Sequence, residues 1–193
     1  VAGLHKAKEI SRSVILERYI TGLDHRLLVI DHKFVAAAKR TPACVVGDGK
    51  SSITALVETV NKDPRRGFGH ENVLTRIEID DHTEKMLARQ NYTADTVPAK
   101  DEVVYLKATA NLSTGGTADD VTEVVHPFNV FLAERVSRII DLDICGIDIM
   151  TDDISIPLNE SGGAVLEVNA APGFRMHLDP TGGIGKNVAE PVV

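Results

Sequence analysis

The sequence predicts an α+β fold with a mainly antiparallel sheet, flanking helices and a helical insertion. Two apolar runs, residues 25–30 and 33–38, are separated by a short polar pair, which is typical of a β-hairpin. Residues 126–140 carry apolar side chains at helical spacing, and the apolar run 144–150 is a further strand candidate. Helical patterns bounded by turn residues occupy roughly 47–100, so we expect the insertion there.

The N-terminal elements follow from local signals. A helix is expected over residues 4–12 and a strand over 13–20, where a Thr-Gly turn signal ends the run. In the insertion, apolar residues on one stripe predict a helix over 52–61, and two glycines predict an exposed loop over 65–73.

Later elements have similar signals. Asp81 and Glu84 fit a capping box that opens a helix to about Gln90, and residues 103–107 are the next strand candidate. The long helix begins at His126-Pro127, since proline is favoured in a first helical turn. Its expected buried stripe consists of Phe128, Phe131, Leu132, Val136, Ile139 and Ile140.

Composition indicates a folded, soluble chain. Apolar residues make up 43% and charged residues 25% of 193 residues, and no apolar run is long enough to span a bilayer. Without a signal-peptide pattern the expected location is the cytoplasm, and Cys44 and Cys145 read as reduced core thiols. A net charge of -7 argues against a general nucleic-acid binder.

Three oxygen-bearing side chains predict a divalent-metal site. Glu167 and Asn169 lie two residues apart, so in a strand they share one face, and pairing with residues 146–149 brings Asp148 beside them. These hard oxygen ligands suit Mg²⁺, which completes its shell with water and phosphate oxygens. Burying the carboxylates without a cation would be costly, although a strand end and a turn cap are the alternative reading.

A glycine pair lies in the loop of residues 111–117. Two adjacent glycines flanked by hydroxyl residues allow backbone N–H groups to point at an anion. A flexible surface turn is the alternative, and the motif is a hypothesis without other support.

The arrangement resembles the C-terminal lobe of an ATP-grasp ligase, and most closely the ATP-grasp domain of the cyanophycin synthetases. The resemblance covers nearly the whole chain, 1–193, as the C-terminal portion of that domain. Its motifs lie at residues 14–22, 24–29, 45–50, 61–67, 110–117 and 167–177.

The resemblance implies a role for each polar group. Residues 17–20 would recognise adenine, with Glu17 accepting from the exocyclic amine and the Ile20 backbone pairing with the ring edge. Asp24 would hold the ribose hydroxyls. Arg26 and Arg40 would face the transferred phosphate and the substrate carboxylate, and Lys39 competes with Arg40 for the second role. The remaining implied residues are the metal ligands Asp148, Glu167 and Asn169, and the acceptor-facing Asn111, Ser113, Gly115, Gly116, Arg175 and His177.

The implied chemistry uses ATP and Mg²⁺. A carboxylate attacks the γ-phosphate to give an acylphosphate, and an amine displaces that phosphate to form an amide. The resemblance implies L-aspartate and the cyanophycin polymer as substrates, with no nucleic-acid or membrane partner. It also implies further lobes and a Mur-ligase-like domain in a longer chain, so we expect the fragment alone to have little activity and to self-associate through the face that the missing lobe would cover.

Two alternatives stay open. One is the ligase domain of a bifunctional glutathione synthetase, which has a similar insertion. The other is a non-catalytic nucleotide- or metal-binding module on the same scaffold.

Overall fold

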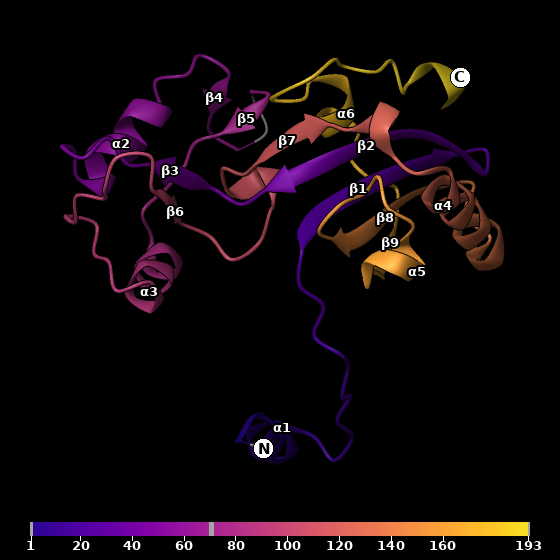
Figure 1. The fold of residues 1–193 in the computed structure, drawn as a ribbon, viewed down its shortest axis with the longest axis horizontal. Helices are drawn as coiled ribbons and strands as arrows, with labels where there is room; N and C mark the ends of the chain where they lie inside the picture. Colours follow the sequence, from indigo (N-terminus) through magenta and orange to yellow (C-terminus); the bar gives the residue numbers. More distant parts are fainter. Residues whose placement is uncertain (1, 70–71, 193) are drawn as a thin grey trace.

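A computed structural model describes residues 2–69 and 72–192 of the chain. Its centre is a five-stranded sheet in the order β7-β2-β1-β8-β9, in which all neighbouring strands are antiparallel. Helices flank this sheet, and a smaller unit of helices and short strands lies beside it (Figure 1). The predicted α+β class with a mainly antiparallel sheet is therefore confirmed.

The hairpin forms where the sequence predicts it. The strands of the sheet are β1 (Leu23–Ile30), β2 (Lys33–Thr41), β7 (Thr117–Asp120), β8 (Ile144–Thr151) and β9 (Ala164–Ala170). Between β1 and β2, Asp31 and His32 have φ of 52° and 56°. Positive φ at two successive residues is typical of a type I′ turn, whose twist matches that of the flanking strands.

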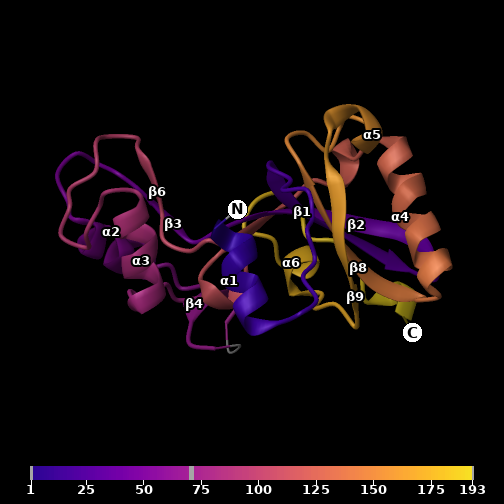
Figure 2. The ribbon, with the colours of Figure 1, turned by 90° about the horizontal axis from the view of Figure 1, so that it is seen from below.

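Backbone pleating gives the sheet two different faces. On one face Leu27, Val29 and Ile147 pack in the main core with α4 (Pro127–Ile140). The other face carries Leu28, in a smaller cluster that Phe174 joins just before α6 (Arg175–Leu178). Figure 2 shows α4 and α6 on opposite sides of the sheet.

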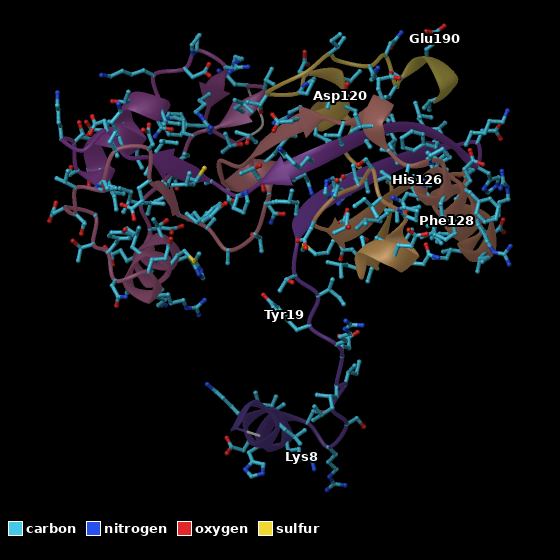
Figure 3. All side chains as sticks on the ribbon, in the orientation of Figure 1. Lys8, Tyr19, Asp120, His126, Phe128 and Glu190 are labelled. Atoms are coloured by element: carbon cyan, nitrogen blue, oxygen red, sulfur yellow. The ribbon has the colours of Figure 1, made fainter. Side chains whose placement is uncertain are left out.

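Helix α4 buries a different stripe from the one that its apolar spacing predicts. Leu132 and Val136 pack against the core, as expected. The other four predicted residues are exposed, and Ile139 retains 71% of its accessible surface (Figure 3 labels Phe128); they are Phe128, Phe131, Ile139 and Ile140. The predicted stripe is thus wrong in part.

The buried stripe of α4 is partly polar, so the spacing of hydrophobic residues does not predict it. Asn129 is completely buried, and its amide nitrogen donates to the carbonyls of Ile154 and Ile156, both at 2.9 Å. Its amide oxygen accepts from the Leu158 N–H at 2.8 Å. Because each polar atom has a partner, burial of this side chain is tolerated and the helix is fixed to the loop after β8.

The smaller unit has its own core. Its main elements are α2 (Ile53–Val60), α3 (Asp81–Arg89) and the strand pair β3 (Cys44–Val46) and β6 (Val103–Tyr105). Ile53, Leu87 and Leu106 are completely buried there. The two predicted helices and the strand near 103–107 are therefore confirmed, with small shifts in their ends.

Two local predictions in this unit are wrong. The N-cap of α3 is Asp80, whose carboxylate accepts from the Thr83 N–H at 2.8 Å, and not the predicted Asp81. The predicted loop over 65–73 includes the short strand β4 (Arg66–Gly67), which pairs in parallel with β5 (Leu74–Thr75). A two-residue strand carries too little periodicity to be read from the sequence.

The remaining helical elements are short. They are the helix α5 (Leu158–Ser161) and the 3₁₀ turns η1 (Leu112–Thr114), η2 (Thr122–Val124) and η3 (Glu190–Val192). Among the helices of the described residues, none is long and apolar enough to cross a membrane.

The N-terminal segment extends away from the body. Helix α1 (Ala2–Ile10) confirms the predicted helix, but residues 13–20 form no strand. Ile15, Leu16 and Tyr19 are all more than four-fifths exposed, at 83%, 89% and 88%, and Tyr19 stands on the extended arm in Figure 3. A strand needs a partner backbone, and no described segment lies along this arm, so propensity alone does not produce one.

The core on the α4 side of the sheet predicts a stability difference. Leu27→Ala should lower the free energy of unfolding by about 2–5 kcal/mol, because the side chain is fully buried and its loss leaves a cavity. Leu166→Ala is the matched control, since Leu166 is 53% exposed and should cost less than about 1 kcal/mol. Urea unfolding followed by circular dichroism measures both, and equal losses would contradict the assignment of the core.

Candidate functional site

The main cavity, of about 1030 Å³, lies over the face of the sheet opposite α4. Side chains from the sheet form one wall, and Met86, Tyr105 and Lys107 from the smaller unit contribute another. The polar residues of the sheet that line it are Asp24, Arg26, Lys39, Arg40, Thr41, Asp148, Glu167 and Asn169.

The register of the strands explains why these groups meet. Arg26 lies directly opposite Asp148 on the neighbouring strand, and Asp148 lies opposite Glu167 on the next. Asp24 lies opposite Arg40 in the hairpin. Directly opposite residues point to the same face, so three strand pairings gather charged groups over one area of the sheet.

Asp148 is the centre of a buried ion-pair network. Arg26 donates to both of its carboxylate oxygens, from Nε to Oδ1 and from Nη2 to Oδ2 at 2.9 Å. Nη2 of Arg40 lies 2.9 Å from Oδ2. All three residues are more than nine-tenths buried, so each charge depends on the others.

Arg40 also connects Asp148 to Asp24. Its Nε and Nη2 donate to Oδ1 of Asp24 at 3.0 and 2.6 Å. Burial works against the charged form of Asp148, but the two arginines outweigh it and hold the pKa of that carboxyl below its usual value. For Asp24 burial has the larger effect and raises the pKa, despite the guanidinium of Arg40.

The predicted metal ligands share the main cavity. Asp148, Glu167 and Asn169 all line it, and the amide nitrogen of Asn169 donates to Glu167 at 3.0 Å. That bond turns the amide nitrogen toward Glu167, and Asn169 still carries an oxygen that can bind a cation. Within residues 2–69 and 72–192 no group of three or more His, Cys, Asp or Glu is placed to hold a metal. The predicted set is not such a group, because it consists of two carboxylates and one amide.

This donor set fits a hard cation that keeps part of its water shell. A carboxylate offers about four lone-pair positions. The arginines use three of those on Asp148, which leaves room for one further partner. Glu167 is exposed to the cavity, so its carboxylate has open positions.

The residues predicted to bind a nucleotide line the cavity, with one exception. Ile20 and Asp24 line it, and so does Tyr19, which lies within the predicted range 17–20. Glu17 is exposed on the extended arm and is outside the lining.

The glycine loop contributes less than predicted. Asn111 lines the cavity and Ser113 is exposed on η1. The N–H groups of Gly115 and Gly116 donate to the carbonyls of Leu112 and Asn111 at 3.2 and 3.1 Å. These two amides are therefore used within the turn, and the predicted anion-binding arrangement of both is wrong.

Close packing explains both glycines instead. Gly115 has φ of 93°, and a Cβ there would lie 2.7 Å from the side chain of Ile77. A Cβ on Gly116 would lie 2.8 Å from the carbonyl oxygens of Asn111 and Thr41. Only glycine fits where these backbones approach each other.

Arg175 and His177 take different positions. Arg175 lies at the start of α6 and donates from Nη1 to the Asn72 carbonyl at 3.1 Å, which joins the body to the smaller unit. His177 is 3% exposed and outside the cavity lining, so the expectation that it faces the acceptor is not met here. Burial, followed by the nearby charge of Arg26, lowers the pKa of His177 to about 4, so its ring is neutral.

The chain is similar in sequence to two groups of known proteins. No protein-family model matches the chain. A cyanophycin synthetase from Trichormus variabilis is 55% identical over 192 residues, which are 100% of this chain and 21% of that protein. A glutathione biosynthesis bifunctional protein from Desulfotalea psychrophila is 35% identical over 185 residues, which are 96% of this chain and 24% of that protein.

A solved structure agrees with the fold. The bifunctional glutathione synthetase from Pasteurella multocida matches with a TM-score of 0.75 and 33% identity, over 90% of this chain and 24% of that one. The chain is a lobe of the ATP-grasp fold. The resemblance of this ATP-grasp lobe to the cyanophycin synthetases is confirmed over its whole length, and it spans about a fifth, 21%, of the first of these relatives.

The ion-pair network of the lobe predicts a large effect of Asp148→Asn. The free energy of unfolding at pH 7 should fall by about 3–5 kcal/mol, because Arg26 would keep a buried charge without a counter-ion and Arg40 would keep only Asp24. Asp63→Asn removes the partner of Arg65, which is about half exposed, and should cost less than about 1 kcal/mol. Urea unfolding measures both variants.

The same variant should show a defined pH dependence. Since folding lowers the pKa of Asp148, its stabilisation is present above the unfolded value of about 4 and is lost as the pH falls through the lower folded value. The stability difference between wild type and Asp148→Asn should therefore narrow in acid. A difference that stays constant from pH 7 to pH 3 would contradict the network.

Proposed function

We propose that this lobe is part of an ATP-dependent ligase that adds L-aspartate to the cyanophycin backbone. The observation that carries the proposal is the 55% identity to a cyanophycin synthetase over all of the chain. The cavity supports it, because cationic, carboxylate and amide groups meet there in one place.

The reaction would proceed through an acylphosphate. The terminal carboxylate of the acceptor attacks the γ-phosphorus of ATP, and the bond to the bridging oxygen breaks to release ADP. The amine of aspartate then attacks the acyl carbon and releases phosphate, so an amide forms and the amine loses a proton. Neither step needs a protein nucleophile, because positioning and charge stabilisation are sufficient.

Each polar group has a proposed task. Arg26 and Arg40 would stabilise charge on the transferred phosphoryl oxygens and orient the acceptor carboxylate. Ile20 would contact the base through its backbone and Asp24 would hold the ribose. Asn111, Ser113 and Arg175 would lie toward the acceptor, and Glu17 would reach the base only if the extended arm turned.

Asp148, Glu167 and Asn169 would hold Mg²⁺, and the bound ion would supply positive charge against the phosphate oxygens of ATP. In this role the arginines keep Asp148 ionised and correctly directed toward the cavity. The protein groups thus fix the position of the nucleotide phosphates relative to the acceptor.

We propose further that the lobe acts within a longer polypeptide, as the C-terminal portion of an ATP-grasp domain whose insertion covers roughly residues 47–100. The cyanophycin synthetase from Trichormus variabilis is much longer than the matched segment, which is 21% of it. By itself the lobe should have little ligase activity, because a nucleotide clamped on one side only is held weakly.

A second candidate is the ligase part of a bifunctional glutathione synthetase. The solved structure with a TM-score of 0.75 favours it, since the fold is shared. The lower identity of 33% makes it the weaker candidate.

A chimera separates these two functions. This chain would replace the matched segment of the Trichormus variabilis cyanophycin synthetase, and ATP-dependent phosphate release would be measured. We expect stimulation by aspartate with a cyanophycin primer, and none by glycine or cysteine with a glutathione precursor. No stimulation by the primer, in a chimera that folds, would exclude the first function.

The metal ligands provide a sharper test in the same chimera. Glu167→Ala and Asn169→Ala should each lower the rate by about 100-fold or more, because few protein groups hold the ion. Glu160→Ala removes an exposed carboxylate outside the cavity and is the matched control. A rate and a Mg²⁺ requirement that stay unchanged in the first two variants would mean that these strands are only structural.

The ribose assignment predicts a selective loss of nucleotide affinity. Asp24→Asn should weaken ATP binding by about 1–3 kcal/mol, since a charge-assisted hydrogen bond is lost. Measuring the equilibrium binding of ATP and the KM for aspartate distinguishes a role in holding the ribose from a role in binding aspartate. A change in the aspartate KM alone would contradict the assignment.

A further inference from the structure

Helix α4 presents an exposed face that contains aromatic and apolar side chains. The opposite side of the helix packs on β1, β2 and β8, and Figure 2 shows α4 at the outer edge of the molecule. Phe131 keeps 53% of its accessible surface and Ile139 keeps 71%. Large apolar side chains that are grouped on one surface in this way usually mark a contact with a partner.

The exposed residues follow the spacing of a helix–helix contact. Phe128, Phe131, Arg135 and Arg138 are all exposed and recur at intervals of three, four and three residues, so they form one stripe along the helix. We call these four residues the outer stripe. Its two aromatic side chains lie in the first half of α4, and its two cations lie in the second half.

The outer stripe is symmetric about the middle of the helix. Phe131 and Arg135 are each two residues from Ala133, and Phe128 and Arg138 are each five residues from it. If a second α4 crosses the first at Ala133 and runs in the opposite direction, each phenylalanine lies opposite an arginine of the copy. A guanidinium group over an aromatic ring is a favourable pair, and a two-fold contact forms each such pair twice.

Both arginines of the outer stripe are available for such a contact. In the part of the chain that the structure describes, Arg135 forms no ion pair with a carboxylate. Arg138 lies 3.5 Å from Glu134 and donates from Nη2 to the His32 carbonyl at 3.0 Å, and its side chain is still 52% exposed. A guanidinium group can donate hydrogen bonds at its edge while its flat face contacts a ring.

We propose that α4 is a two-fold interface, at which it pairs in antiparallel with α4 of a second copy of this chain. Phe131 would lie against the partner's Arg135, and Phe128 against the partner's Arg138. Ile139 would contact the partner's Pro127 and lose exposed apolar surface. A membrane surface fits the outer stripe less well, because it would not require aromatic and cationic residues to be placed symmetrically about one point.

This interface would leave the main cavity of each copy open. The cavity lies over the face of the sheet opposite α4, so the two cavities would face away from the contact. The inference goes beyond the proposed function and does not depend on it, since the association needs neither ATP nor an acceptor.

The test is the molecular mass of the 193-residue chain, measured by sedimentation velocity at about 100 μM, where a dimer with a Kd of about 10 μM or below is largely formed. We expect the wild type to be mainly a dimer, with twice the mass of 20.8 kDa. Phe131→Lys and Arg135→Glu should each weaken the association by about tenfold or more, because each places an unfavourable pair at two symmetric positions. Both positions are exposed, and unchanged circular dichroism would confirm that the variants fold.

An equimolar mixture of these two variants is the decisive measurement. In a mixed pair the introduced lysine lies opposite the introduced glutamate, while the remaining Phe131 lies opposite the remaining Arg135. Dimers should therefore return in the mixture, with an affinity at least about tenfold above that of either variant alone. Only an antiparallel contact in this register predicts the recovery.

The control is Ile15→Ser/Leu16→Ser, which removes exposed apolar side chains from the extended arm and should leave the dimer unchanged. A monomeric wild type would overturn the proposal, as would a loss of dimers in the arm variant equal to that in the α4 variants. A mixture without recovery would also overturn it. Binding of the monomeric wild type to phosphatidylserine vesicles, lost in both α4 variants, would assign the outer stripe to a membrane instead.

Discussion

Asp148 is buried between the guanidinium groups of Arg26 and Arg40 on one face of the central sheet. A charge in that position is costly unless it is paired, and each arginine is equally dependent on the carboxylate. The network therefore requires β1 to lie between β2 and β8 and to pair with both in the observed register. A shift by one residue would send these side chains into the apolar face beneath α4.

The same constraint explains how the cavity acquires its chemistry. Asp24 and Glu167 lie at opposite edges of the network, and both face the cavity because they share the pleat of Arg40 and Asp148. The network keeps Asp148 ionised, so a cation or a phosphate ligand meets groups whose charges and directions are already set. Little rearrangement would be needed for binding, which is the usual advantage of a preorganised site.

The smaller unit completes the cavity and contributes a surface of its own. It contacts the body through Arg175 and Asn72, while Lys107 lines the cavity and pairs with Asp80. Its separate core, which includes Ile53, Leu87 and Leu106, holds its helices and strands together independently of the sheet. The sheet thus carries the buried ion-pair network on one side of the cavity, and the smaller unit forms the other side.

Local patterns in the sequence determined the elements and several of their side-chain directions. The hairpin, the helices, and the common face of Glu167 and Asn169 follow from short-range periodicity and turn chemistry, which act through neighbouring residues. Tertiary contacts decided the rest. Asn129 is buried because distant carbonyls satisfy its amide, and residues 13–20 remain unpaired because a strand needs a partner that periodicity does not supply. The contact of Arg40 with Asp148 and the burial of His177 depend on the packing of separate strands and of α6. Such long-range contacts cannot be predicted from the local spacing of residues.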